Sequence, residues 1–178
     1  MLKPTSTVAR VRSAIIEHGI RTTVRELSTT THTAADAAAA LRCEIAQIAK
    51  TVVFETKPNS EAVLVIASGA KRINEDAVAK LLDRKIAKAS AKFVLEKTGF
   101  VIGGVSPIGS ITPLTIVFDS SLLHFKTIWA AAGSSHAVFE VTPSELRRAT
   151  NAILLESSIS SGNSSLDRFS IPLRDFLP

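Results

Sequence analysis

Residues 103–109, Gly-Gly-Val-Ser-Pro-Ile-Gly, carry the most specific chemical signal in the sequence. Two adjacent glycines, Gly103 and Gly104, allow positive φ angles and the close approach of a ligand. Pro107 fixes its own φ and restricts Ser106 toward an extended conformation. Such a loop can hold backbone amides in a fixed array that binds a carbonyl oxygen or a developing oxyanion. A tight structural turn is the alternative interpretation.

Two polar side chains lie where strands are predicted to begin. Lys50 stands between a helical pattern and the apolar run 51–54, where a partly shielded ammonium group can bind an anion or a carbonyl oxygen. His136 follows the small-residue segment 131–135 and precedes an apolar strand, so its side chain can face a cleft from a loop tip. For Lys50 the alternative is a solvated position at an element boundary, and for His136 the sequence favours neither a cleft nor solvent.

Metal and cofactor chemistry has little support in the sequence. The four histidines, His18, His32, His124 and His136, form no i,i+4 pair, and Cys43 has no second cysteine to join it. Cys43 lies in the predicted alanine-rich helix between Arg42 and Glu44, which indicates a small, partly buried residue rather than a nucleophile. The sequence also lacks a Gly-x-Ser-x-Gly elbow, a Walker loop and a dinucleotide-binding fingerprint. We therefore expect neither a metal nor a cofactor.

Composition indicates one globular domain. The chain has 178 residues, of which 46% are hydrophobic and 21% are charged, and its one cysteine excludes an internal disulfide. Neither a signal peptide nor an apolar run of about 20 residues is visible, so we expect a cytoplasmic protein without a membrane partner.

The net charge of +5 is concentrated in residues 1–50 and 71–97. Clustered lysine and arginine suit a phosphate backbone, although they also solvate helix surfaces. In the second segment Lys80, Arg84 and Lys88 recur at helical spacing, and we expect them to share one helix.

The elements that position these residues alternate between helices and strands. We expect helices from the cap Thr7 to Gly19, from Thr33 through Ile48, after the cap Asn74, before Gly99 and from Thr142. Predicted strands cover residues 22–27, 51–54, 62–67, 100–102, 114–118, 127–131 and 137–141. This order predicts a single α/β domain, residues 1–156, with a mixed β-sheet wrapped by helices, and a Ser-rich C-terminal tail, residues 157–178.

Several of these features occur in the order found in one known family. Lys50 precedes an apolar strand, the 103–109 loop follows, Asp119 ends the next strand, and Gly133 and His136 come after it. Over about residues 5–155 the sequence resembles the YbaK/prolyl-tRNA synthetase-associated domain family of aminoacyl-tRNA deacylases.

The resemblance implies a pocket that hydrolyses the ester between a wrong amino acid and its tRNA. Lys50 resembles the family's pocket lysine, and residues 103–107 match its Gly-x-x-x-Pro loop. The implied mechanism is substrate-assisted, because the 2′-hydroxyl of the terminal adenosine helps to activate water. The implied catalytic residues are Lys50, Gly103, Gly104, Ser106 and Pro107, of which Ser106 is not a nucleophile, and the implied substrate-binding residues are Val105, Asp119, Gly133 and His136.

The expected substrate is a mischarged aminoacyl-tRNA that carries a small amino acid, with a proline-type tRNA as the family's commonest partner. An aminoacyl-tRNA synthetase is a further candidate partner. Residues 110–113 lack the paired lysines of some bacterial members, which argues against the branch that removes cysteine from proline tRNA. We expect a dry cavity that selects by size, because one methylene group changes binding by only about 1–3 kcal/mol. Its expected lining is Val53, Ile66, Ile102 and Val105.

Two other functions remain open at this point. One is a non-catalytic module that binds tRNA or a synthetase in the same cleft. The other is a hydrolase of some other small acyl ester.

Overall fold

An eight-stranded mixed sheet lies at the centre of the computed structural model, which describes residues 6–29, 31 and 33–156. The strand order is β1-β7-β6-β2-β3-β5-β8, and β4 pairs with β2. The strands are β1 (Val24–Glu26), β2 (Ile48–Lys57), β3 (Ala62–Ser68), β4 (Lys85–Lys88), β5 (Thr115–Asp119), β6 (Ile128–Ser134), β7 (Ala137–Val141) and β8 (Ile153–Leu155). The predicted α/β fold with a mixed sheet is confirmed, whereas the predicted tail 157–178 lies outside the described residues.

Both faces of the central strand β3 are covered. All seven of its residues are buried, and Leu64 and Ile66 belong to a different apolar cluster from Val63 and Val65. Neighbouring residues of a strand project to opposite faces, so two apolar layers flank the sheet. This explains why the segment is continuously apolar instead of alternating.

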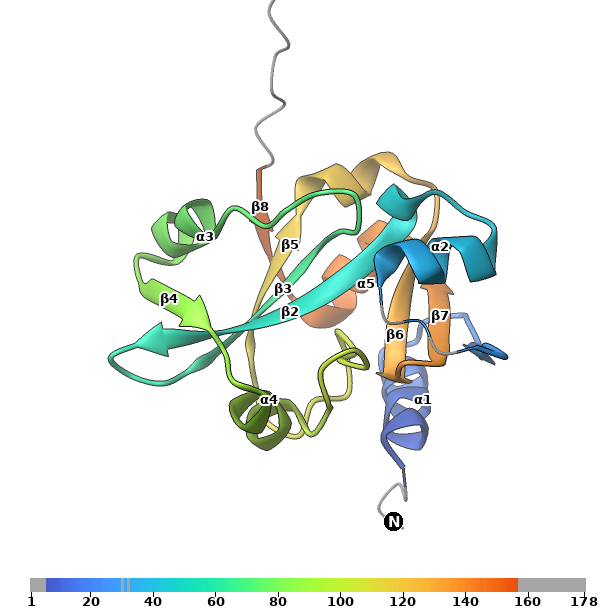
Figure 1. The fold of residues 1–178 in the computed structure, drawn as a ribbon, viewed down its shortest axis with the longest axis horizontal. Helices are drawn as coiled ribbons and strands as arrows, with labels where there is room; N and C mark the ends of the chain where they lie inside the picture. The colour runs from blue at the N-terminus through green and yellow to red at the C-terminus, as the bar shows by residue number, and fades with distance from the viewer. Residues whose placement is uncertain (1–5, 30, 32, 157–178) are drawn as a thin grey trace, which may run out of the picture.

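Different helices lie at the two ends of the sheet. The α-helices are α1 (Thr7–Glu17), α2 (Ala34–Leu41), α3 (Glu75–Leu82), α4 (Ala91–Thr98) and α5 (Pro143–Thr150). Figure 1 shows α1 and α2 beside β6 and β7 at one end, and α3 with β4 at the other. No helix in the described part of the chain is long and apolar enough to cross a membrane.

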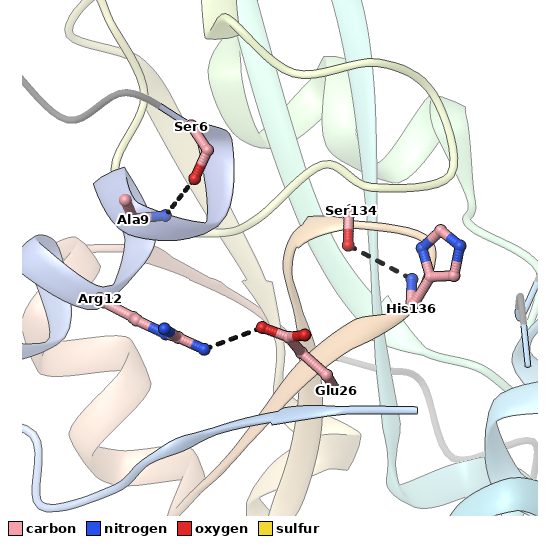
Figure 2. Close-up of polar contacts among 6 residues, drawn as sticks. All are labelled: Ser6, Ala9, Arg12, Glu26, Ser134 and His136. Atoms are coloured by element: carbon pink, nitrogen blue, oxygen red, sulfur yellow. Dashed lines mark hydrogen bonds and ion pairs between the residues drawn. The ribbon is translucent and has the colours of Figure 1, made fainter. Parts of the chain in front are cut away.

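The predicted helix starts agree closely with the structure. Thr33 and Thr142 each form a capping box, and the Asn74 side chain accepts a hydrogen bond from the Ala77 amide at 3.0 Å. Thr7 was the wrong cap for the first helix, because the Ser6 hydroxyl accepts from the Ala9 amide, as Figure 2 shows.

The alanine-rich helix is shorter than predicted. It ends at Leu41 because Arg42 takes the left-handed conformation, with φ of 55°. A single 3₁₀ turn, Ile45–Gln47, follows, and Ile48 already begins β2. Lys50 is therefore the third residue of a strand and does not mark its boundary.

Residues 85–88 and 100–102 differ from their predicted structure. Asp83 is left-handed and ends α3, and Lys85–Lys88 then pairs with β2, so Lys80, Arg84 and Lys88 do not share one helix. Residues 100–102 form a turn rather than a strand, with Phe100 buried and Ile102 63% exposed. The short strand β8 was not predicted from the sequence.

Gly133 is required by close packing of β6 against the start of α1. Its φ is +93°, and a Cβ there would lie 2.8 Å from the Thr7 carbonyl group. Gly133→Ala is expected to lower the free energy of unfolding by about 2–5 kcal/mol, measured by urea denaturation. Gly19→Ala is the matched control, because its φ is +65° with open space around the new atom, and about 1–2 kcal/mol is expected. Equal losses in the two variants would contradict this account.

Candidate active site

A pocket lies where β2 separates from β6. The parallel pairing of the two strands covers Ile48 and Ala49, and β2 then pairs with β4 from Phe54 onward. Between these points, residues 50–53 leave one strand edge uncovered by β4 or β6. The pocket has a volume of about 260 Å³. It is lined by Thr31, Thr33, Ala34, Ala37, Leu41, Ile48, Ala49, Lys50, Thr51, Gly103, Val105, Trp129, Ala130, Ala131, Ser134 and Val138.

Lys50 enters the lining from β2. Burial lowers the pKa of its ammonium group, and the nearby negative charge of Asp119 partly opposes this effect. The Nζ atom donates a hydrogen bond to the Lys71 carbonyl oxygen in the loop after β3. Lys50 is thus a half-buried cation held at the pocket, which suits an anionic or carbonyl ligand.

The glycine loop forms another wall of the pocket through Gly103 and Val105. Gly103 has φ of +92°, and open space lies where its Cβ would be. The Gly104 amide is already used, because it donates to the Val101 carbonyl oxygen at 3.0 Å. Gly103 and Val105 make no such backbone hydrogen bond within the described residues, so their amides are the ones available to a ligand.

Gly104 has a packing function instead. A Cβ at this position would lie 2.7 Å from the Cα of Ser134, at the irregular end of β6. Only glycine lets the loop approach the β6 backbone this closely. The contact places Gly103 and Val105 against the pocket.

Arg10 of α1 holds both ends of this loop, a function that was not predicted from the sequence. Its guanidinium group donates to the carbonyl oxygens of Gly99 at 2.9 Å and Gly109 at 2.6 Å, and it lies 4.4 Å from the centre of the Phe100 ring. Burial lowers the pKa of Arg10. Since the loop is some 90 to 100 positions away in the chain, no local sequence pattern marks Arg10.

The apolar part of the pocket comes from different residues than predicted. Val53 and Ile66 are buried in the core outside the lining, and Ile102 is exposed; of the four expected residues, Val105 alone lines the pocket. The apolar wall is built by the alanine-rich α2, by the start of β2 and by the strands β6 and β7. Its larger members are Leu41, Ile48, Trp129 and Val138.

Three further predicted site residues lie outside the lining. Ser106 is fully buried, and its Oγ accepts from the Ile108 amide at 3.4 Å. Pro107 lines a separate cavity of about 190 Å³ beside His18. Asp119 ends β5 as predicted and accepts from the Ser121 amide at 2.9 Å, and its charge acts on Lys50.

The end of β6 and the turn that follows it hold the remaining predicted residues. Gly133 packs under α1 as described above. The exposed His136 donates through its backbone amide to the Ser134 hydroxyl at 3.3 Å, as Figure 2 shows. Its carbonyl oxygen accepts from the Leu27 amide at 2.6 Å. Ser134 lines the pocket, so His136 is one turn residue away from it and outside the lining.

No group of three potential metal ligands occurs among the described residues. Cys43 is half-buried, and burial, followed by the charges of Glu140 and Glu44, raises the pKa of its thiol. This environment disfavours a thiolate nucleophile.

A model of the aminoacyl-tRNA editing domain matches residues 28–149, which include the whole pocket lining. The chain belongs to the aminoacyl-tRNA editing domain family. The resemblance inferred from the sequence is thereby confirmed. A relative of this editing domain protein is the uncharacterized protein YwhH of Bacillus subtilis (strain 168), which is 31% identical over 136 residues, 76% of this chain and 86% of YwhH.

Solved structures agree with the family assignment. The editing domain is similar to "a putative trans-editing enzyme for prolyl tRNA synthetase", with 36% identity and a TM-score of 0.80 over 88% of this chain and 98% of the other. It is also similar to the hypothetical protein APE2540, with 30% identity and a TM-score of 0.76 over 82% of this chain and 96% of the other. Family and structure together support an editing role on aminoacyl-tRNA.

Proposed function

We propose that the protein is a trans-editing deacylase that hydrolyses the ester bond between a small amino acid and the 3′ end of a mischarged tRNA. A proline-type tRNA is the proposed carrier, which the similarity to a structure named for prolyl-tRNA synthetase editing supports. The observation that carries the proposal is the pocket at the sheet opening, which brings Lys50 together with Gly103 and Val105.

The dimensions of the pocket support a small substrate. A volume of about 260 Å³ is just below the usual range of ligand sites, about 300–1,000 Å³, and alanines 34, 37, 49, 130 and 131 supply much of the wall. A synthetase site binds a smaller amino acid with little penalty, since the lost methylene groups are worth only about 1–3 kcal/mol each. A second site that admits only small side chains removes these errors by hydrolysis.

The proposed reaction needs little from the protein beyond positioning and charge stabilisation. The oxygen of a water molecule, activated by the terminal 2′-hydroxyl, bonds to the ester carbonyl carbon. The bond from that carbon to the ribose 3′ oxygen then breaks, and a proton passes to this oxygen. The products are the free amino acid and tRNA with an intact 3′ end. The Gly103 and Val105 amides bind the developing oxyanion, and Lys50 binds the terminal phosphate or the aminoacyl carbonyl oxygen.

A deacylation panel tests this function. The protein is mixed with tRNAs that carry alanine, serine, threonine or cysteine, with correctly charged prolyl-tRNA, and with free aminoacyl esters. The proposal predicts release from at least one mischarged tRNA, with prolyl-tRNA and the free esters largely untouched. Turnover of the free esters alone would support a general esterase, and tRNA binding without release would support a non-catalytic module.

Lys71, whose carbonyl oxygen accepts the hydrogen bond from Lys50, and its neighbour Arg72 both have exposed cationic side chains. We expect Lys71→Gln/Arg72→Gln to raise KM for mischarged tRNA several-fold with little change in kcat, because phosphate contacts bind ground and transition states equally. The slope of log affinity against log salt should fall by about 0.7 for each lost contact to single-stranded tRNA. Lys92→Gln is the control, since Lys92 is exposed on α4 and pairs with Glu96. Equal effects in both variants would exclude a specific tRNA path beside Lys50.

A further inference from the structure

Thr51 carries a buried hydroxyl group without a hydrogen-bond partner. Three buried side-chain oxygens in the described residues share this property, on Thr51, Ser110 and Ser121, and Thr51 is the one that lines the pocket. Folded proteins pair nearly all buried polar groups, because an unpaired one loses its hydration without compensation. An unpaired hydroxyl in a pocket wall is therefore a candidate contact for a ligand.

The backbone of Thr51 is also available at this place. The Ile48 carbonyl oxygen accepts from the Gly69 amide at 2.7 Å, which fixes the hydrogen-bonding phase of the β2–β3 pair. The backbone groups of Lys50 thus point toward β3, and those of Thr51 point away from it. The pairing with β6 stops at Ala49. Thr51 consequently directs an amide and a carbonyl group toward the opening in the sheet.

The side chains of Thr51 and Lys50 project to opposite faces of the sheet. Thr51 lies in phase with Ala49 and Val53, which belong to the same apolar cluster as Val105 of the glycine loop. Lys50 is on the other face, under the influence of Asp119. A positively charged ligand group at Thr51 is therefore separated from the Lys50 ammonium by the strand.

The lining contains no aspartate or glutamate among the described residues, so a ligand amine has to bind to neutral oxygens. The other lining hydroxyls are engaged: Thr31 donates to the Ser135 carbonyl oxygen at 2.8 Å, Thr33 accepts from the Asp36 amide at 3.1 Å, and Ser134 accepts from the His136 amide at 3.3 Å. Thr51 offers an unused hydroxyl and a carbonyl oxygen from one residue. An ammonium group has three donors that match such acceptors.

We propose that Thr51 binds the α-amino group of the aminoacyl ester through its hydroxyl and carbonyl oxygens. This inference rests on the proposed function and adds to it a basis for selecting aminoacyl over other acyl groups. Thr51 is a positioning residue: it orients the ester carbonyl carbon toward the Gly103 and Val105 amides.

Binding of two non-hydrolysable analogues of the terminal adenosine tests the proposal by calorimetry. One analogue carries alanine through a 3′ amide, and the other carries propionate, which lacks the amino group. We expect Thr51→Val to lower the affinity for the alanyl analogue about tenfold and to leave the affinity for the propionyl analogue unchanged. Valine keeps the shape of threonine and lacks its hydroxyl group. Thr51→Ser should bind both analogues within about twofold of the wild type.

The melting temperature separates this role from a structural one. Because the hydroxyl has no partner in the protein, Thr51→Val should melt no lower than the wild type. Equal weakening of both analogues, unchanged binding of the alanyl analogue, or no binding of either analogue to the wild type would overturn the proposal. The deacylation panel is run on the same wild-type preparation. If this preparation releases amino acid from mischarged tRNA while the binding experiment contradicts the Thr51 contact, the proposed function stands and only the Thr51 proposal is wrong.

Discussion

Lys50→Met is expected to lower the single-turnover rate of deacylation by about a hundredfold, without loss of folding stability. Lys50 is the charged residue among those that line the pocket, and Gly103 lines the same pocket. Methionine keeps much of the aliphatic stem and removes the ammonium group that would bind substrate. Rapid-quench deacylation and urea denaturation at neutral pH measure the two quantities.

The direction of the stability effect follows from the pKa of Lys50, which burial lowers. A lysine whose pKa is lower in the folded state favours the unfolded chain at pH values where both states are protonated. This penalty is relieved as the pH rises above the folded-state pKa toward the unfolded value. Wherever both states are protonated the penalty is fully present, so its removal in Lys50→Met should leave the free energy of unfolding unchanged or raise it.

Lys50→Arg serves as the matched charge control. A planar guanidinium group does not replace a compact ammonium group, so this variant should also be impaired although it keeps the charge. A well-folded Lys50→Met protein with wild-type turnover would remove Lys50 from the mechanism.

Gly103→Ala is the second substitution with a large expected effect. The new Cβ has open space around it, but φ of +92° is strained for alanine. The variant protein therefore either loses about 1–2 kcal/mol of folding stability or changes the conformation of the loop. A change of conformation turns the Gly103 and Val105 amides away from the ester. Loss of one oxyanion donor raises the barrier by about 2.7–4 kcal/mol, so kcat should fall by about a hundredfold to a thousandfold.

Two variants at neighbouring positions serve as controls for Gly103→Ala. Gly104→Ala should impair activity and also lower stability by about 1–3 kcal/mol, because its Cβ meets the Ser134 backbone. Ser106→Ala should have a mild effect on kcat, since its buried hydroxyl binds the Ile108 amide and lies outside the lining. An inactive Ser106→Ala beside an active Gly103→Ala would refute the backbone account and indicate a serine nucleophile.

Local signals predicted the helix starts and the central strands well. The capping boxes at Thr33 and Thr142 involve residues three positions apart, so the sequence contains the complete interaction. The end of α2 was missed because it depends on the left-handed Arg42, and tertiary pairing of Ile48 with Trp129 overrides the helical pattern beyond it.

The pocket lining was predictable at residues whose type suggests a chemistry, and unpredictable where distant elements meet. Lys50 and Gly103 were identified from the sequence and do lie together in one pocket. Arg10 and Thr51 were missed, because the first acts across about 90 to 100 positions and the second depends on where β2 leaves β6. The difference between Gly103 and Gly104 likewise depends on a contact with β6, far along the chain.

The most direct test of the account is a single-turnover time course with proline tRNA charged with labelled alanine and with excess protein. We expect the wild type to release alanine far faster than the spontaneous rate and to leave prolyl-tRNA intact, whereas Lys50→Met, folded to the same extent, releases it at close to the spontaneous rate. Release by Lys50→Met at the wild-type rate would contradict a catalytic role for Lys50 in this pocket. Spontaneous release with the wild type across every mischarged tRNA of the panel would contradict the deacylase function itself.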